Sequence, residues 1–152
     1  MRLSTRGRYA LRMMLDIALH PDDASVSLKS IAQRQQISVK YLEQIVTPLV
    51  RGGDLKASRG AQGGYQLSRP AEAYTVGHIL RTIEGSLSPV TCLEGGPESC
   101  ERSAQCATVE IYRRIDEAIN QVVDNITLAD LVEIQQKKWD GAEAPDLPHA
   151  AE

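Results

Sequence analysis

Two short amphipathic segments separated by a tight turn constrain this chain more than any other feature of its sequence. Serine is a strong helix N-cap, and Ser27 and Ser38 each precede a stretch with apolar residues at helical spacing. We therefore expect a short helix over residues 28–33 and, after a turn, a longer one over 39–51. Pro48 removes one backbone donor from the longer helix and is expected to bend or loosen its last turn. Two helices in this arrangement form a helix-turn-helix.

A glycine-rich basic hairpin is predicted directly after the second helix. Residues 54–58 and 64–68 read as short strands, and the tip between them begins with Arg59 and Gly60. A helix-turn-helix followed by a hairpin is a winged helix. Apolar spacing and capping residues predict four further helices, which begin near residues 4, 75, 106 and 128. The expected fold class is mainly α with a small β-wing, in which a winged helix-turn-helix head is followed by a long helix over about 106–124.

Charge is distributed unevenly along the chain. Residues 1–70 carry eleven Lys or Arg and five Asp or Glu, a net charge of +6, whereas residues 71–152 carry six and fifteen, a net charge of −9. The sum is the −3 of the whole chain. A chance imbalance would have no consequence, but a basic half that also contains a helix-turn-helix favours contact with a polyanion.

The predicted head contains side chains suited to reading DNA. Recognition helices contact base edges near their N-termini. There, Gln44 can pair with adenine, and Glu43 can accept from cytosine or disfavour sites that lack this donor. Arg59 at a flexible tip suits a narrow minor groove, and arginines near the first helix, including Arg2 and Arg6, can hold phosphates. The predicted DNA contacts are Arg2, Ser38, Lys40, Tyr41, Glu43, Gln44, Arg59 and Gly60.

Three cysteines lie close together in a loop rich in Gly, Ser, Pro and Glu. Cys92, Cys100 and Cys106 are separated by seven and five residues, which is neither a CxxC pair nor a zinc-ribbon spacing. Three thiolates on one loop suit an iron–sulfur cluster, 2Fe-2S or 4Fe-4S. The spacing alone leaves two alternatives open: three free thiols acting as redox switches, or a zinc site completed by a carboxylate or histidine. Glu110, one turn after Cys106, is the nearest candidate for a fourth ligand.

Several classes of protein are disfavoured by the sequence. It contains no nucleophile–base pairing, phosphate-binding glycine loop or paired carboxylates, so we expect neither an enzyme nor a small-molecule substrate. No apolar run approaches the roughly 18 residues that span a membrane, and the N-terminus lacks a signal-peptide core. We expect a cytoplasmic protein.

The motifs together resemble those of the IscR-type regulators, a family that includes NsrR, RirA and CymR. The resemblance covers residues 1 to about 134 and rests on MRLSTRGRYA at 1–10, YLEQ at 41–44, RGAQGGY at 59–65, TVGHIL at 75–80 and IEG at 83–85. It implies a homodimeric transcription regulator, with dimerisation through the long helix, and a roughly palindromic double-stranded DNA operator. It also implies that Cys92, Cys100 and Cys106 bind an iron–sulfur cluster.

Two positions depart from the family pattern. Val109 stands where IscR proper has a histidine ligand, and Arg8 stands where the nitric-oxide sensor type uses an aspartate. The fourth ligand and the cluster type therefore stay open. The alternative is a cluster-free regulator of sulfur metabolism like CymR, which lacks the three cysteines and acts through a partner protein. The expected segments are a winged head over 1–85, a cluster loop over 86–105, dimerisation and C-terminal helices over 106–140 and a disordered tail over 141–152.

Overall fold

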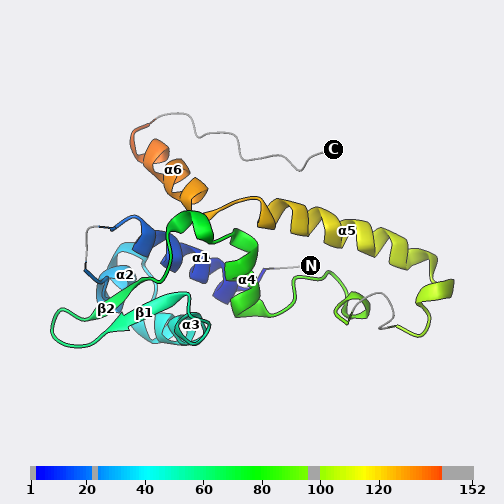
Figure 1. Cartoon of the computed structure of the whole chain (residues 1–152), viewed down its shortest axis with the longest axis horizontal. Coiled ribbons are helices and arrows are strands. Elements are labelled where there is room, and N and C mark those ends of the chain that lie inside the picture. Colours follow the sequence, from blue (N-terminus) through cyan, green and yellow to red (C-terminus); the bar gives the residue numbers. More distant parts are fainter. Residues whose placement is uncertain (1–2, 22–23, 96–99, 142–152) are drawn as a thin grey trace.

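The computed structural model describes residues 3–21, 24–95 and 100–141. Four helices and a two-stranded sheet form a head, and the long helix α5 extends away from it (Figure 1). The elements are α1 (Thr5–Ala18), α2 (Leu28–Gln35), α3 (Val39–Arg51), β1 (Leu55–Ser58), β2 (Gly64–Leu67), α4 (Val76–Glu84), α5 (Ala107–Asp124) and α6 (Leu128–Trp139), with short 3-10 turns at Ala71–Ala73, Thr91–Leu93 and Ser103–Gln105. This architecture confirms the predicted fold class.

Capping side chains explain where most of the helices begin. At α1, α2, α3, α4 and α6 the residue before the helix accepts a hydrogen bond from a backbone N–H of the first turn, which would otherwise lack a partner. At α6 the Asp130 carboxylate also accepts from the N–H of Thr127 at 2.7 Å, which completes a capping box. The capping residues are Ser4, Ser27, Ser38, Thr75 and Thr127.

Helix α3 continues through Pro48 to Arg51. The N–H of Gly52 donates to the Pro48 carbonyl at 2.8 Å, so the last turn stays closed, whereas the sequence predicted it to bend or loosen. Proline cannot donate to the carbonyl four residues earlier, which belongs to Gln44. Nη2 of Arg6 on α1 donates to that oxygen at 3.2 Å instead. An arginine of another helix thus satisfies the carbonyl that the proline leaves without its usual donor.

The wing is a two-stranded antiparallel sheet in which Leu55 pairs with Leu67. The segment between α1 and α2 joins its outer strand, because the N–H and carbonyl of Val26 both bond to Tyr65 at 2.8 Å. Glycine is required beside this contact. A Cβ at Gly64 would lie 2.5 Å from the Val26 carbonyl oxygen, closer than real Cβ atoms approach. The wing is therefore fixed to the head on both sides of its base.

The hydrophobic core lies inside the head and receives side chains from every one of its helices. Helix α6 contributes Leu128, which is fully buried, and packs against α1. The sequence grouped this helix with α5, whereas its first turn belongs to the core of the head. Each buried aliphatic side chain contributes roughly 1.5–3 kcal/mol. The core includes Ala10, Met13, Met14, Ile17, Ile31, Leu42, Ile45, Leu49, Leu55, Tyr74, Ile79 and Leu128.

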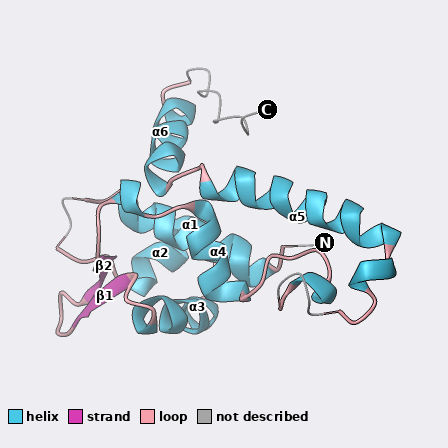
Figure 2. Ribbon diagram, turned by 45° about the vertical axis from the view of Figure 1, so that its right-hand side comes forward, coloured by secondary structure: helices cyan, strands magenta, loops and turns pink. Residues whose placement is uncertain are grey.

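Helix α5 has a different character from the helices of the head. Of its 18 residues only Val109 is buried, and Ile111, Ile115 and Val122 are 52, 41 and 47% exposed. Figure 2 shows it projecting from the head in a second view. Its length and composition do not suit a bilayer: no described helix is both long and apolar enough to cross one. Among the residues that the structure describes, no other element covers the apolar stripe that Ile111, Ile115 and Val122 form.

Candidate DNA interface and cysteine loop

Helix α3 exposes the polar residues that the sequence predicted as DNA contacts. Lys40, Glu43 and Gln44 are exposed. Ser38 is exposed too, but its hydroxyl oxygen accepts from the N–H of Tyr41 at 3.2 Å, so it also caps the helix. Tyr41 is half-buried and its ring meets that of Tyr9 edge-on, with centroids 5.5 Å apart. Tyr41 therefore packs α3 against α1 in addition to any contact with DNA.

The tip of the wing is formed by exposed residues. Arg59 and Gly60 both lie at the surface. Gly60 has φ +108°, a conformation that side chains disfavour, and its carbonyl accepts from the N–H of Gly63 at 2.9 Å. The backbone of the tip thus presents Arg59 on a turn that needs glycine. The predicted contact Arg2 lies outside the described residues.

A buried carboxylate holds the base of the wing, and sequence reasoning did not find it. Asp54 is 1% exposed. Its Oδ1 accepts from Nη2 of Arg69 at 2.7 Å and lies 2.7 Å from Nε2 of His78, and its Oδ2 accepts from the hydroxyl of Thr82 at 3.3 Å. The hydroxyl of Tyr74 donates to the Asp54 carbonyl at 2.7 Å. Asp54 thereby joins the wing to α4.

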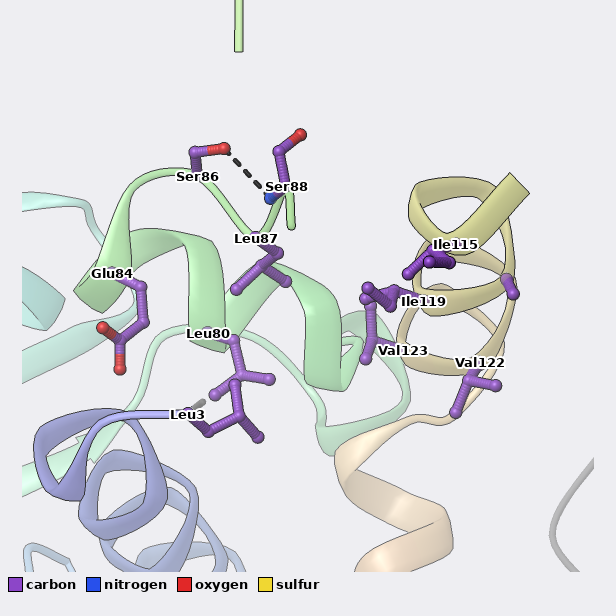
Figure 3. Close-up of a pocket in the computed structure, with 11 residues that line it drawn as sticks. Leu3, Leu80, Glu84, Ser86, Leu87, Ser88, Ile115, Ile119, Val122 and Val123 are labelled. Carbon is purple, nitrogen blue, oxygen red and sulfur yellow. Dashed lines mark hydrogen bonds between the residues drawn. The ribbon is translucent and has the colours of Figure 1, made fainter. Parts of the chain in front are cut away.

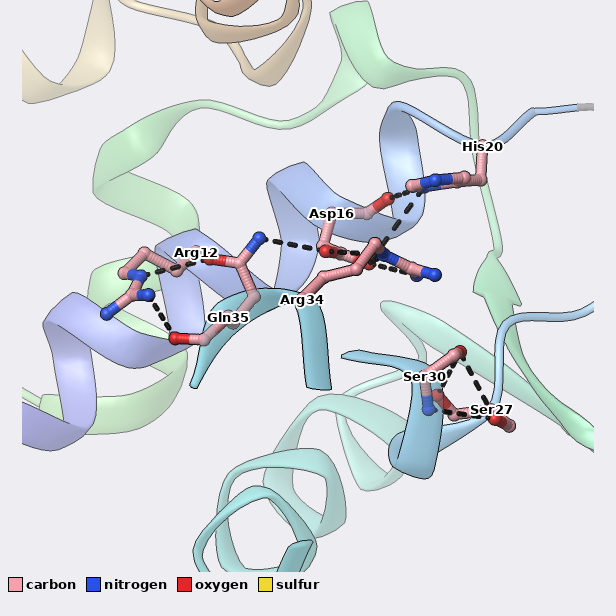
Figure 4. Close-up of polar contacts among 7 residues, drawn as sticks. All are labelled: Arg12, Asp16, His20, Ser27, Ser30, Arg34 and Gln35. Atoms are coloured by element: carbon pink, nitrogen blue, oxygen red, sulfur yellow. Dashed lines mark hydrogen bonds and ion pairs between the residues drawn. The ribbon is translucent and has the colours of Figure 1, made fainter. Parts of the chain in front are cut away.

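A second buried carboxylate fixes α2 on α1 (Figure 4). Asp16 is 2% exposed and accepts from the Arg34 guanidinium at 2.5–3.2 Å and from the Gln35 amide at 2.8 Å. Arg12 donates to both the side chain and the carbonyl of Gln35. The next residue, Gln36, has φ +54° and makes the turn into α3. These contacts set where the recognition helix begins.

The three cysteines follow one another along the segment between α4 and α5. Cys92 lies in the first 3-10 turn of that segment, Cys100 just before the second, and Cys106 directly before α5, without a capping hydrogen bond from its side chain. All three are half-buried, and no disulfide joins them. Among the described residues no three Cys, His, Asp or Glu side chains are grouped closely enough to hold a metal ion. The cysteines are thus close in the chain but not gathered at one point.

The environment of Cys106 favours its thiolate. The hydrogen bond with the Thr108 hydroxyl, at 3.1 Å, is the main cause that lowers the pKa of Cys106 below its ordinary value. Backbone bonds of Val109 and Thr108 and the charge of Arg102 act in the same direction, and desolvation opposes them. A thiolate is the form of cysteine that binds metals.

Two of the positions considered for a fourth ligand, Val109 and Glu110, lie in the first turn of α5. The exposed Glu110 carboxylate accepts from Nη1 of Arg113 at 3.0 Å. Val109 is only 2% exposed, so its position faces packed residues rather than the loop surface.

Helix α5 is fastened to the head near its C-terminal end. Arg81 on α4 donates to both carboxylate oxygens of Asp124, at 2.6 and 2.9 Å, and to Asn120 at 2.6 Å. The hydrogen bond to Asp124 is the main cause that raises the pKa of Arg81 above its ordinary value. On the same face of α5, two turns before Asp124, Asp116 accepts from the Ser88 hydroxyl at 2.8 Å, so the cysteine-bearing segment is tied to the same helix.

An apolar groove lies between α4, the segment after it and α5 (Figure 3). It has a volume of about 560 Å³. Leu3 and Leu80 line it on the side of the head, and Ile115, Ile119 and Val122 line it on α5. The groove is continuous with the exposed apolar stripe of α5, because Ile115 and Val122 belong to both.

The three-helix arrangement, the wing and the exposed polar face of α3 define a winged helix-turn-helix DNA-binding protein. The sequence profile of the Rrf2 family, described as an iron-dependent transcriptional regulator, matches residues 3–134. The chain therefore belongs to the Rrf2 family of transcription regulators and is not an enzyme. This confirms the resemblance to IscR-type regulators.

Relatives with known names cover most of the chain. It is 45% identical to the protein rrf2 of Nitratidesulfovibrio vulgaris over 132 residues, 87% of each chain. It is 41% identical to the HTH-type transcriptional regulator IscR of Yersinia enterocolitica over 135 residues, 89% of this chain and 81% of the relative.

Solved structures of the family have the same fold. The structure of CymR (YrzC), the global cysteine regulator of B. subtilis, is similar with a TM-score of 0.73 and 42% identity, covering 87% of this chain and 96% of that one. T. potens IscR is similar with a TM-score of 0.72 and 36% identity, covering 96% and 94%. The chain is thus similar both to IscR and to CymR proteins.

Proposed function

We propose that this regulator senses iron–sulfur, iron or redox and nitric-oxide status through a 2Fe-2S or 4Fe-4S cluster held by Cys92, Cys100 and Cys106. The observation that carries the proposal is the position of the three thiols. They all lie on the segment that joins the DNA-binding head to α5, and the last of them directly precedes α5. Such a cluster supplies a group that oxidants and nitric oxide attack.

The donor chemistry supports this assignment, although the thiols are not gathered. Three thiols are soft ligands, and the lowered pKa of Cys106 favours the ligating form. Because no three candidate ligands are grouped among the described residues, the segment has to rearrange for the three thiols to share one site. Metal binding and local folding are commonly coupled in this way. The loop, here residues 86–105, then differs in order between the two states.

We also infer that the protein works as a homodimer on a roughly palindromic operator. The apolar stripe of α5 and the groove beside it support a second copy as the occupant, and a two-fold dimer presents two equivalent heads to DNA. Residues 1–85 act as the head and residues 106–140 carry the dimer helix, with the tail over 141–152 outside both. The DNA contacts are those predicted from the sequence on α3, at the wing tip and at Arg2.

The thiol ligands are tested by anaerobic purification of the wild-type protein, followed by visible spectroscopy and by iron and sulfide counting. We expect a brown protein with visible absorbance and bound iron and sulfide. Cys92→Ala, Cys100→Ala and Cys106→Ala should each lose the absorbance, and Glu110→Ala tests whether this exposed carboxylate, whose Oε1 bonds to Arg113, is the fourth ligand. A colourless wild-type protein without metal after reconstitution with iron and sulfide would refute the cluster.

The alternative function is that of a cluster-free regulator that acts through its thiols or through a partner protein, as proposed for CymR-like chains. Two observations favour it: the similarity to a CymR structure at 42% identity and the separation of the three thiols. The same purification separates the two functions. A metal-free protein that nevertheless binds its operator and responds to thiol oxidants supports the alternative.

A further inference from the structure

The outward face of α3 extends beyond the residues predicted to read bases. Lys40, Gln44, Thr47 and Arg51 follow one another at spacings of four, three and four residues and form one stripe along the helix. All four are exposed. The opposite face carries the buried residues Leu42, Ile45, Val46 and Leu49.

The C-terminal half of this stripe borders an open hollow of about 670 Å³. The hollow lies where α3 meets the start of α1 and the end of α4. Arg6 and Arg51 provide its charge, and Thr47 and Thr82 also line it. The Thr47 hydroxyl donates to the Glu43 carbonyl, and the Thr82 hydroxyl donates to Asp54 and to the His78 carbonyl. Among the residues that the structure describes, neither of these two arginines forms an ion pair with a carboxylate. The hollow therefore offers two uncompensated guanidinium groups.

One of the two arginines is held in place by the helix that it flanks. Arg6 bonds to the carbonyl of Gln44, which has no intrahelical donor because Pro48 lacks an N–H. One neutral backbone oxygen uses only part of the guanidinium, which has five N–H donors in a planar fork. The remaining donors stay available for an anion, and the fork matches the geometry of phosphate.

The length of the recognition helix α3, compared with the width of the DNA major groove, indicates that the anion is a DNA phosphate. At 1.5 Å per residue, Arg51 lies about 16 Å along α3 from Lys40, which exceeds the width of the DNA major groove, about 12 Å. With the N-terminal turns of α3 at the base edges, its last turn reaches the groove wall, where the phosphates lie. We propose that Arg6 and Arg51 form a seat for a phosphate of the DNA backbone. The inference rests on the proposed binding of duplex DNA, and the size of the expected effect rests on the proposed homodimer; neither depends on a cluster.

The test compares salt dependence of binding for the full-length protein and its variants on a fluorescently labelled, mixed-sequence DNA duplex. Each phosphate contact adds about 0.9 to the slope of log K against log salt. Because a dimer carries two seats, Arg51→Gln and Arg6→Gln should each lower the slope by about 1.8. When the variant and the wild type bind equally at 1 M salt, this slope difference makes the variant bind about 60-fold more weakly than the wild type at 0.1 M salt. Arg51→Lys keeps the charge and should restore most of the slope.

The control is Lys138→Gln, which removes one positive charge from α6, on the side of the head away from α3 (Figure 1). It should leave the slope unchanged. Thermal melting of each variant establishes that it is folded. A wild-type slope in folded Arg51→Gln protein would overturn the phosphate seat and leave DNA binding intact. An equal loss of slope in Lys138→Gln would also overturn the seat, because it would indicate a bulk charge effect. Wild-type protein that binds no duplex would instead refute the underlying DNA-binding function.

Discussion

Asp54 shows how one residue can set the geometry of the wing. A carboxylate that is 1% exposed requires polar partners, because an unpaired buried charge is strongly destabilising. Here the partners come from the strand end at Arg69 and from α4 at His78 and Thr82. These bonds offset the cost of burying the carboxylate, and they hold the wing in one orientation relative to the rest of the head.

We expect Asp54→Asn to lower the free energy of unfolding by about 1–3 kcal/mol, because the amide nitrogen meets donors and Arg69 loses its counter-ion. The lower part of this range allows for solvent screening of Arg69, which is 46% exposed. Urea unfolding followed by circular dichroism measures the change. Asp140→Asn, at an exposed position after α6, is the matched control and should change stability by less than about 0.5 kcal/mol. Equal effects of the two substitutions would contradict the role of Asp54.

At the scale of elements, the contact between α4 and α5 depends on the absence of a side chain at Gly77. A Cβ there would lie 2.0 Å from Oδ1 of Asp124 and 2.9 Å from Cγ2 of Val123. Gly77 is buried in the first turn of α4, one helical turn before Arg81, which bonds to the same aspartate. The two residues together fix where α5 leaves the head.

Gly77→Ala should therefore destabilise the protein by about 1–3 kcal/mol, as overpacking does, although alanine is the better helix former by about 1 kcal/mol. Chemical denaturation of Gly77→Ala, Arg81→Ala and the double variant forms a double-mutant cycle. Because both substitutions disrupt the position of Asp124, the double variant should lose less stability than the sum of the two. Strict additivity, or a stabilised Gly77→Ala, would show that the close approach of α5 is not required.

The elements were more predictable from the sequence than the contacts between them. Local signals sufficed for α3 and α6, whose observed bounds are those expected from Ser38, Gly52 and the Thr127 cap. The exposed residues of the recognition helix follow from the same spacing. By contrast, the partners of Asp54 lie 15 to 28 positions away and Arg81 lies 43 positions from Asp124, and no local pattern pairs such residues. The packing of α6 on the head is missed for the same reason.

At the scale of the whole molecule, the cysteines lie on the segment between α4 and α5, two helices that are also bonded to each other. The cysteine-bearing segment begins where α4 ends and is tied to α5 through Ser88 and Asp116. Helix α5 is tied back to α4 through Arg81. Under the proposed function, a change in the order of the segment would alter how α5 lies against the head, and in the proposed dimer this would set the spacing of the two recognition helices.

The proposed role of α5 in dimerisation can be tested with a single charge. Val122 is 47% exposed on the apolar stripe of α5 and also lines the groove, so Val122→Asp places a charge where a second copy would desolvate it. We expect a monomer by light scattering. Because two linked heads bind a palindrome as one unit, operator affinity should fall by roughly 10²- to 10⁴-fold. Trp139→Asp alters an equally apolar and more exposed residue, at 66%, on α6, and should leave a dimer with wild-type affinity. If Val122→Asp stays dimeric, or if Trp139→Asp also dissociates, the apolar stripe of α5 is not the specific interface. The state of the cluster could then not change the spacing of the heads through α5.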